Sequence, residues 1–151
     1  MKKSGRKVNP EQNRYNTVVT IIDGNNALIK ILAIASGGAI GAMLRYAVAS
    51  GTHALFGRGF PYGTLVVNVV GCLGMGFLYI LLLERLSLGP EWRAALQVGL
   101  LGAFTTFSTF SMETLLLLES GETQKAVINI ILSVFLCLAA TWAGMVLGRQ
   151  L

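Results

Sequence analysis

The sequence predicts an all-α membrane protein with four transmembrane helices, and three observations support this fold class. The chain has 151 residues, of which 54% are hydrophobic and only 13% are charged. Its mean hydropathy of +0.65 lies outside the usual range of soluble domains. Four apolar runs, each about as long as a bilayer-spanning helix, are separated by short polar segments. We therefore expect one small membrane-embedded domain.

Residues 1–27 are polar and basic and precede the first apolar run. They contain five of the chain's 12 Lys and Arg residues. Their apolar patch, residues 18–22, is too short for a signal-peptide core, which needs about 7 to 15 apolar residues. The sequence predicts a disordered cytoplasmic extension here, or residues that precede the natural start of the working protein.

The four helices are expected within residues 28–151, and the first is predicted at 29–50. With about 22 residues it would be roughly 33 Å long, enough to cross a bilayer. Gly37 and Gly41 give it a smooth face against which another helix can pack closely. Arg45 continues that face, and a guanidinium inside a span must snorkel to the surface, pair or line water. The other helices are expected at about 62–83, 94–118 and 126–148.

The second predicted helix contains an amide side chain, Asn68, inside its apolar sequence. Thr64 lies one turn before it and Gly71 follows it. An intramembrane Asn can simply join two helices, with hydrogen bonds worth about 0.6–2 kcal/mol. It can also line a polar path and offer N–H donors to an anion. The sequence leaves both interpretations open.

The third predicted helix is unusual because hydroxyls, phenyl rings and a carboxylate interrupt its apolar sequence. Residues 102–113 read GAFTTFSTFSME. Gly99, Gly102 and the pair Thr105–Thr106 have low helix propensity, so we expect the helix to break here. Carbonyls freed by such a break in a membrane helix commonly coordinate a cation. The alternative is a continuous helix whose hydroxyls bond the i−4 carbonyls.

Polar residues also align after the expected break and along the fourth helix. Phe107, Phe110 and Glu113 recur every three residues and share one helix face. In the fourth helix, small and polar residues that include Asn129 and Ser133 form a second stripe. Polar atoms aligned on at least three helices exceed what a lipid-facing bundle needs.

Other classes of function find little support in the sequence. The basic residues outside the N-terminal extension form no patch, which argues against nucleic acid as a partner. Cys72, Cys137 and His53 are too few for a zinc centre, and their spacing fits no catalytic triad. We predict no redox role for the two cysteines, which are expected to pack as small hydrophobic residues.

The charge distribution predicts topology only weakly. Without the extension, the side that holds the N-terminus has four Lys or Arg residues and the other side has two. Counting the extension changes this to nine against two, which favours a cytoplasmic N-terminus. Because four short helices are too small a bundle to enclose a pore, we expect a homodimer. A weak charge bias permits its two copies to be antiparallel.

Three motifs in order resemble the Fluc (CrcB) family of fluoride channels. They are GGAIGA at 37–42 with Arg45 and Tyr46, GTLVVN at 63–68 with Gly71, and GAFTTFSTFS at 102–111 with Glu113. The resemblance covers about residue 31 to the C-terminus, and the third motif is highly specific. The basic N-terminal extension departs from the family pattern and argues against dual topology.

The resemblance implies a fold, a role and a cofactor. The fold would be an antiparallel, dual-topology homodimer with two fluoride pathways. The role would be passive export of fluoride across the bacterial inner membrane, which protects the cell from fluoride. The cofactor would be a structural Na⁺ at the centre of the dimer, held by the backbone carbonyls of Gly102 and Thr105.

The implied pathway is lined by hydrogen-bond donors. Fluoride is small and strongly hydrated, so a channel must replace its water with N–H, O–H and polarised C–H groups, without a fixed charge that traps it. Phe107 and Phe110 match the family's pore phenylalanines, whose ring edges carry positive quadrupole density. The residues expected along the pathway are Arg45, Thr64, Asn68, Thr106, Phe107, Ser108, Phe110, Glu113 and Ser133.

Two other functions compete with a channel. A small proton-coupled, multidrug-type exporter would use Glu113 as its proton site. Such exporters need a membrane-buried carboxylate in the first helix, where this chain has Arg45. A structural subunit of a larger complex would leave the hydroxyls of the third helix unexplained.

Overall fold

The structure, a computed structural model, describes residues 10–82 and 88–151, with side chains described from residue 26 onward. No strand occurs among these residues. Within the described ranges, four helical segments are long and apolar enough to cross a membrane, namely Asn26–Phe56, Tyr62–Ile80, Pro90–Glu119 and Thr123–Gln150. The predicted fold class, an all-α membrane protein with four spans, is therefore confirmed.

The first, second and fourth spans are single helices, whereas the third is assembled from shorter pieces. The single helices are α1 (Pro10–Phe56), α2 (Tyr62–Ile80) and α6 (Thr123–Gln150). The third span comprises α3 (Pro90–Arg93), the π-helical segment η2 (Ala94–Leu101), α4 (Gly102–Phe104) and α5 (Phe107–Glu119).

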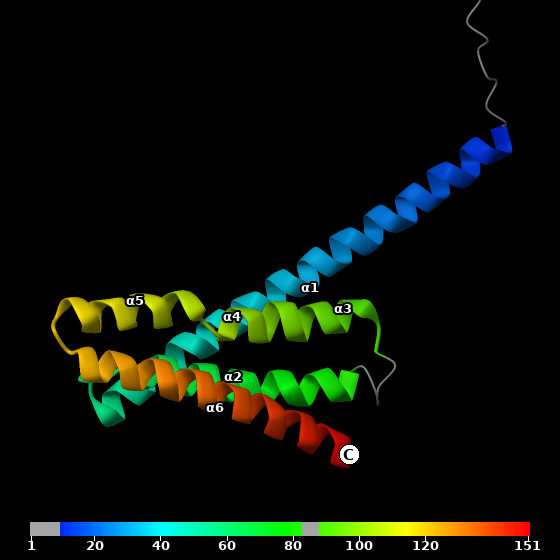
Figure 1. The fold of residues 1–151 in the computed structure, drawn as a ribbon. Coiled ribbons are helices and arrows are strands. Elements are labelled where there is room, and N and C mark those ends of the chain that lie inside the picture. Colours follow the sequence, from blue (N-terminus) through cyan, green and yellow to red (C-terminus); the bar gives the residue numbers. More distant parts are fainter. Residues whose placement is uncertain (1–9, 83–87) are drawn as a thin grey trace, which may run out of the picture.

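The N-terminal end of α1 differs most from the predicted helix boundaries. The sequence predicts disorder up to residue 27, whereas the structure has helix from Pro10. Extending an existing helix avoids the cost of nucleation, and no proline follows Pro10 to stop it. In Figure 1 this part of α1 projects beyond the bundle. Residues 1–9 of the predicted extension, and residue 83 at the predicted end of the second span, lie outside the described residues.

Helices α2 and α6 run side by side in the same direction, as Figure 1 shows. Glycines allow this close approach. A Cβ on Gly76 of α2 would overlap the carbonyl oxygen of Thr141, and a Cβ on Gly144 of α6 would overlap that of Leu73. Because backbone meets backbone here, the register between the two helices is strictly determined.

The glycine face predicted on the first helix also packs against a neighbour, as expected. Gly37 and Gly41 of α1 touch the backbone of the third span, where an added Cβ would overlap the carbonyl oxygens of Ala95 and Leu100. The third span is therefore held against α1 through its first half, before the expected break.

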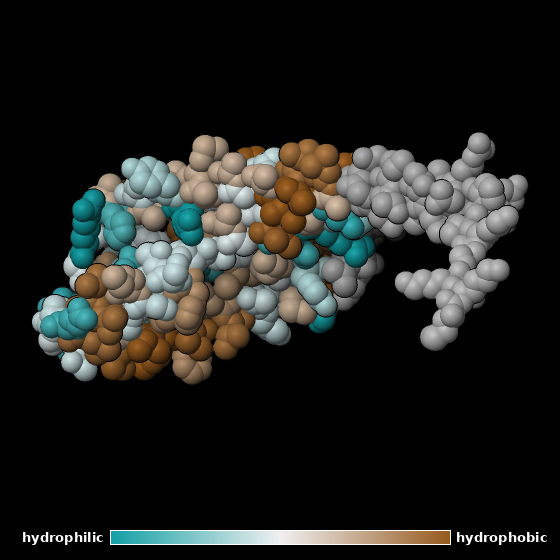
Figure 2. Space-filling model, turned by 90° about the horizontal axis from the view of Figure 1, so that it is seen from above, coloured by the Kyte–Doolittle hydropathy of each residue, from teal (hydrophilic) through white to brown (hydrophobic). Residues whose placement is uncertain are grey.

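Much of the outer surface is apolar. Figure 2 shows broad hydrophobic surface on the face it displays. On α6, the side chains of Phe135 and Trp142 are 68% and 69% exposed. Such surface is unfavourable in water but suits contact with lipid or with another protein chain.

Candidate functional site

The third span breaks between α4 and α5, at Thr105 and Thr106. Both residues have extended backbones, with φ/ψ of −79°/159° for Thr105 and −153°/113° for Thr106. The predicted broken helix is therefore confirmed, and a continuous helix is excluded. The low helix propensity of residues 102–106 allows the break, but other contacts must satisfy the backbone groups that it frees.

One side chain of α2 replaces helical hydrogen bonds at the break. Asn68 Nδ2 donates to the carbonyl oxygen of Thr106 at 3.0 Å, and the Thr106 N–H donates to Asn68 Oδ1 at 2.8 Å. The carboxamide thus pairs with the backbone of Thr106 as a second peptide group would. We refer to this pair as the Asn68 clamp. It uses one of the two Nδ2 hydrogens, so the other is available to a second acceptor.

Further contacts hold both ends of the break. Thr105 donates its N–H and its hydroxyl to the carbonyl of Leu101, at 3.0 and 3.1 Å. Thr106 Oγ1 accepts the N–H of Thr109 at 3.2 Å and so caps α5. A Cβ on Gly71 would overlap the methyl group of Thr105, so this methyl lies directly on the backbone of α2.

At the break, two backbone carbonyls lose the N–H donors that a continuous helix would give them. They are the carbonyls of Gly102 and Thr105, which are predicted to bind Na⁺. In a continuous α-helix, Gly102 would accept the N–H of Thr106, and Thr105 would accept the N–H of Thr109. Here those two N–H groups donate to Asn68 Oδ1 and Thr106 Oγ1. Released carbonyl oxygens are suitable ligands for a hard monovalent cation, so the local geometry fits the predicted ligands.

A hollow of about 400 Å³, which we call the central hollow, lies beside the break between α2, α5 and α6. Its lining contains no charged residue among those the structure describes. It brings together five residues that the sequence assigns to the fluoride pathway, namely Asn68, Thr106, Phe107, Phe110 and Ser133. Thr105, a predicted Na⁺ ligand, also lines it.

The two phenyl rings lie next to one another on α5. Their centroids are 5.4 Å apart and their planes are inclined by 44°. The predicted shared face of Phe107 and Phe110 is thus present. Phe107 is 78% exposed in the single chain, whereas Phe110 is half-buried. The ring of Phe107 is therefore available to a partner chain or to lipid.

A buried hydrogen-bond chain positions the backbone of Phe110. Asn129 on α6 is 1% exposed, and its Nδ2 donates to Thr114 Oγ1 at 2.9 Å. Thr114 Oγ1 in turn donates to the carbonyl oxygen of Phe110 at 2.7 Å. The sequence places Asn129 in a polar stripe but does not connect it with Phe110. The spacing of Phe110 and Thr114, four residues apart on one helix, is the signal that could have done so.

Arg45 and Thr64 lie in a second hollow of about 270 Å³, between α1, α2 and the break. Thr106 lines both this hollow and the central hollow, so one residue separates them. Of the alternatives for the guanidinium of Arg45, the structure favours lining a cavity over snorkelling to the surface, because the side chain is half-buried there.

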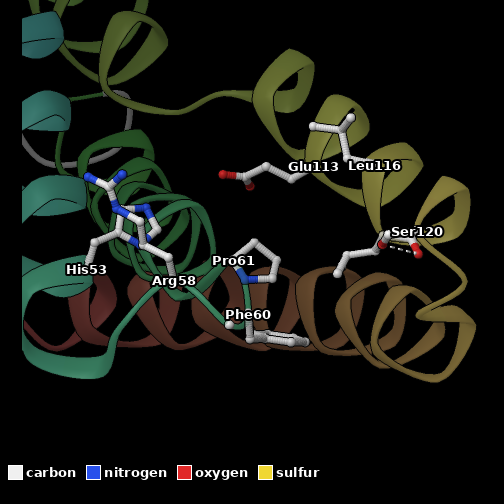
Figure 3. Close-up of a pocket in the computed structure, with 9 residues that line it drawn as sticks. His53, Arg58, Phe60, Pro61, Glu113, Leu116 and Ser120 are labelled. Carbon is white, nitrogen blue, oxygen red and sulfur yellow. Dashed lines mark hydrogen bonds between the residues drawn. The ribbon is translucent and has the colours of Figure 1, made fainter.

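Glu113 lies in a third hollow, of about 600 Å³, at one end of the bundle. Figure 3 shows its carboxylate reaching into this hollow, with His53 and Arg58 on the opposite side. Glu113 Oε2 and His53 Nδ1 are buried without a hydrogen-bond partner. The predicted face of Phe107, Phe110 and Glu113 thus extends from the central hollow to a separate one.

Two predicted residues line none of these three hollows. Ser108 is exposed, and its hydroxyl lies 3.2 Å from that of Thr106. Gly102 is also exposed. Both lie at the break, next to residues of the central hollow.

The fold and this site together define a class of protein: a multi-pass membrane protein whose broken span borders a hollow with no charged residue in its described lining. Residues 32–145 match the family described as "CrcB-like protein, Camphor Resistance (CrcB)". The chain belongs to this family. It is a multi-pass protein of the bacterial inner membrane.

Several similar proteins carry the name "Fluoride-specific ion channel FluC". That of Shewanella amazonensis is 56% identical over 114 residues, which are 76% of this chain and 91% of the relative. That of Geobacter sulfurreducens is 51% identical over 121 residues, or 80% and 98%. That of Methylococcus capsulatus is 54% identical over 123 residues, or 82% and 54%. This chain therefore spans only about half the length of the Methylococcus relative.

Proposed function

We propose that this chain forms a fluoride-selective channel that lets fluoride leave the cytoplasm passively. The similar proteins named as fluoride channels support this proposal. The structural observation that carries it is the central hollow, where the Asn68 amide and the rings of Phe107 and Phe110 meet beside the break. A passive channel needs no catalytic step, so we propose no enzymatic activity.

The chemistry of the central hollow suits a small, strongly hydrated anion. The free N–H of Asn68 and the hydroxyl of Ser133 offer hydrogen bonds, and the edges of the two rings offer polarised C–H groups. No described lining residue carries a charge that would hold the anion too tightly to release it. We assign supporting donor roles to Thr106 and Ser108 at the break.

Charged residues in the flanking hollows would act on fluoride before or after the central hollow. Arg45 raises the local concentration of anions beside Thr106, one residue away from the central hollow. Thr64 lies with Arg45 and adds a hydroxyl. At the other end of the α5 face, the hollow of Glu113 also contains Arg58 and His53.

The working unit in this proposal is an antiparallel homodimer with a structural Na⁺ at its centre. Phe107 and Gly102 are exposed in the single chain, so a second chain could cover the surface at the break. The carbonyls of Gly102 and Thr105, whose helical donors are diverted, would hold Na⁺ there. Na⁺ held there would supply a positive charge that stabilises the carbonyl oxygens.

The proton-coupled exporter is not favoured by the comparisons, since the similar proteins are named as fluoride channels. The structure places Glu113 in a hollow that Asn68 and Phe107 do not line. A proton site for that exporter would therefore be separate from the central hollow.

The proposed selectivity is tested by anion efflux from liposomes that contain the purified protein. When valinomycin opens a potassium leak, we expect fluoride to leave while chloride stays inside. Fluoride-selective and chloride-selective electrodes record the two anions in the same sample. Equal release of both anions, or no release of fluoride, contradicts the channel proposal.

The role of the rings is tested by Phe110→Ile, which keeps an apolar side chain but removes the aromatic edge. An aromatic contact is worth about 0.5–1.5 kcal/mol, so we expect fluoride efflux to fall by about 2- to 12-fold. Phe135→Ile is the matched control, because Phe135 is an exposed phenylalanine of α6 that lines none of the hollows. If both variants conduct at the wild-type rate, the ring of Phe110 serves only packing.

The dimer and its Na⁺ are tested together by light scattering of the purified protein in detergent. In sodium buffer we expect the mass of two chains, and in N-methylglucamine buffer we expect those dimers to dissociate at a lower temperature. A single-chain mass, or the same thermal stability in both buffers, contradicts the proposal.

Labelling of a Gln124→Cys variant by an impermeant maleimide tests the topology. Partial labelling from outside fits antiparallel copies, whereas complete or absent labelling does not.

A further inference from the structure

The close packing of α2 and α6 determines which residues of the two helices face each other. Gly76 lies against Thr141, and Ile80 lies against Gly148 further along the same direction. One helical turn before the first of these contacts, α2 has Cys72 and α6 has Cys137. The register that the glycines impose therefore places the two cysteines opposite each other.

The side chains of the two cysteines do meet. Both are free thiols, and the thiol of Cys72 is the neighbouring group that acts on the thiol of Cys137. Both are half-buried, and both line the central hollow. The sequence predicts that they pack as isolated hydrophobic residues, because it does not reveal the register of α2 and α6. The structure instead makes them a dithiol that opens onto a cavity.

We propose that Cys72 and Cys137 form a binding site for one soft, thiophilic centre, either trivalent arsenic or a d¹⁰ cation such as Hg²⁺. Two sulfur–metal bonds form and each thiol releases its proton, so no electrons are transferred. With phenylarsine oxide, the two protons leave with the arsenic-bound oxygen as one water molecule. Thiolates are the ligands that soft metals prefer.

The site selects against metals that need more ligands. The described residues contain no group of three or more His, Cys, Asp and Glu side chains that could hold a metal ion. The described part of the chain thus supplies two of the four ligands of a tetrahedral zinc site. Two thiols suffice for a centre that binds two sulfurs, and the close packing of α2 and α6 holds both sulfurs in place before binding. This preorganisation lowers the entropy cost of forming the second bond.

An occupant of this site would lie in the wall of the proposed fluoride pathway. Asn68 lies one turn before Cys72 on α2, and Ser133 lies one turn before Cys137 on α6. All four residues line the central hollow. Occupancy of the dithiol therefore narrows the hollow beside the amide of Asn68, and we expect it to reduce fluoride flux. The expected fall in fluoride flux rests on the proposed channel function, whereas binding of the soft centre does not.

Binding is tested by intact-mass spectrometry of the reduced, full-length protein in detergent. After treatment with phenylarsine oxide and a wash with excess 2-mercaptoethanol, we expect one phenylarsenic adduct per folded chain. Dithiothreitol should remove it, because only another dithiol competes with the chelate. Cys72→Ala and Cys137→Ala should keep no adduct through the wash. The site does not exist if the wild type keeps none, or if either variant keeps one.

A second measurement covers the case in which a variant does not fold. Wild-type protein unfolded in dodecyl sulfate before treatment has the same two thiols but lacks the register of α2 and α6. It should lose the adduct in the monothiol wash. If the unfolded chain keeps the adduct as well as the folded chain does, the folded geometry contributes nothing and the proposal is wrong.

Flux is tested in liposomes, with each preparation compared with its own starting rate. Phenylarsine oxide should remove most of the wild-type fluoride efflux, and dithiothreitol should restore it. Cys137→Ala should keep the rate that it had before treatment. If the adduct forms but wild-type efflux is unchanged, the dithiol does not border the conducting path. If untreated wild-type protein conducts no fluoride, the proposed channel function fails, and the mass measurement still decides the binding site.

Discussion

The Asn68 clamp is the interaction on which the site depends. A helix that breaks within a membrane exposes N–H and C=O groups to surroundings that offer no water, and each unpaired group there costs several kcal/mol. The carboxamide of Asn68 meets this requirement for Thr106 by bonding both its N–H and its C=O. A neighbouring helix thereby supplies what the broken helix no longer provides itself.

The break separates the third span into two parts with different roles. On the N-terminal side, carbonyls lose their helical donors and become available to a cation. On the C-terminal side, α5 starts anew with Thr106 as its cap and directs Phe107 and Phe110 toward the central hollow. We propose that backbone atoms serve the first role and side chains the second. Substitutions in the two parts should therefore have different consequences.

The helices around the break act as a frame for it. Glycines of α1 hold the first half of the third span, and Gly71 of α2 receives the methyl group of Thr105. The buried chain from Asn129 through Thr114 then ties the carbonyl of Phe110 to α6. Each neighbouring span thus contacts a different part of the third span, which explains how a span with extended backbone in its middle keeps one geometry.

The sequence predicts the fold and the break well because hydropathy, glycine spacing and helix propensity are local properties. The four spans, the glycine face of Gly37 and Gly41, and a break in the third span all follow from them. The break is narrower than expected from low helix propensity, because residues 102–104 stay helical and only Thr105 and Thr106 are extended. The N-terminal part of α1, from Pro10 to Asn26, does not follow from these properties, because a helix can continue past its apolar segment. The π-helical start of the third span has no signal that we recognise in residues 94–101.

Partnerships across helices are harder to predict than positions along one helix. Asn68 has two plausible roles in the sequence, and the structure reveals that it joins two helices while also lining a cavity. Apart from Ser108, which lines none of them, the predicted pathway residues are divided among three hollows. The meeting of Cys72 with Cys137 depends on the register of α2 and α6, which no local pattern encodes. The roles of these residues in fluoride conduction stay predictions.

The most direct measurement of the central claim combines fluoride efflux with hydrogen exchange in Asn68→Leu. Leucine has a similar size but cannot pair with Thr106, which leaves two backbone groups unsatisfied at about 1–3 kcal/mol each. We expect faster exchange of the Thr106 amide and loss of most fluoride efflux, while Val70→Leu on the exposed side of α2 changes neither. Wild-type exchange and wild-type efflux in Asn68→Leu would contradict the account.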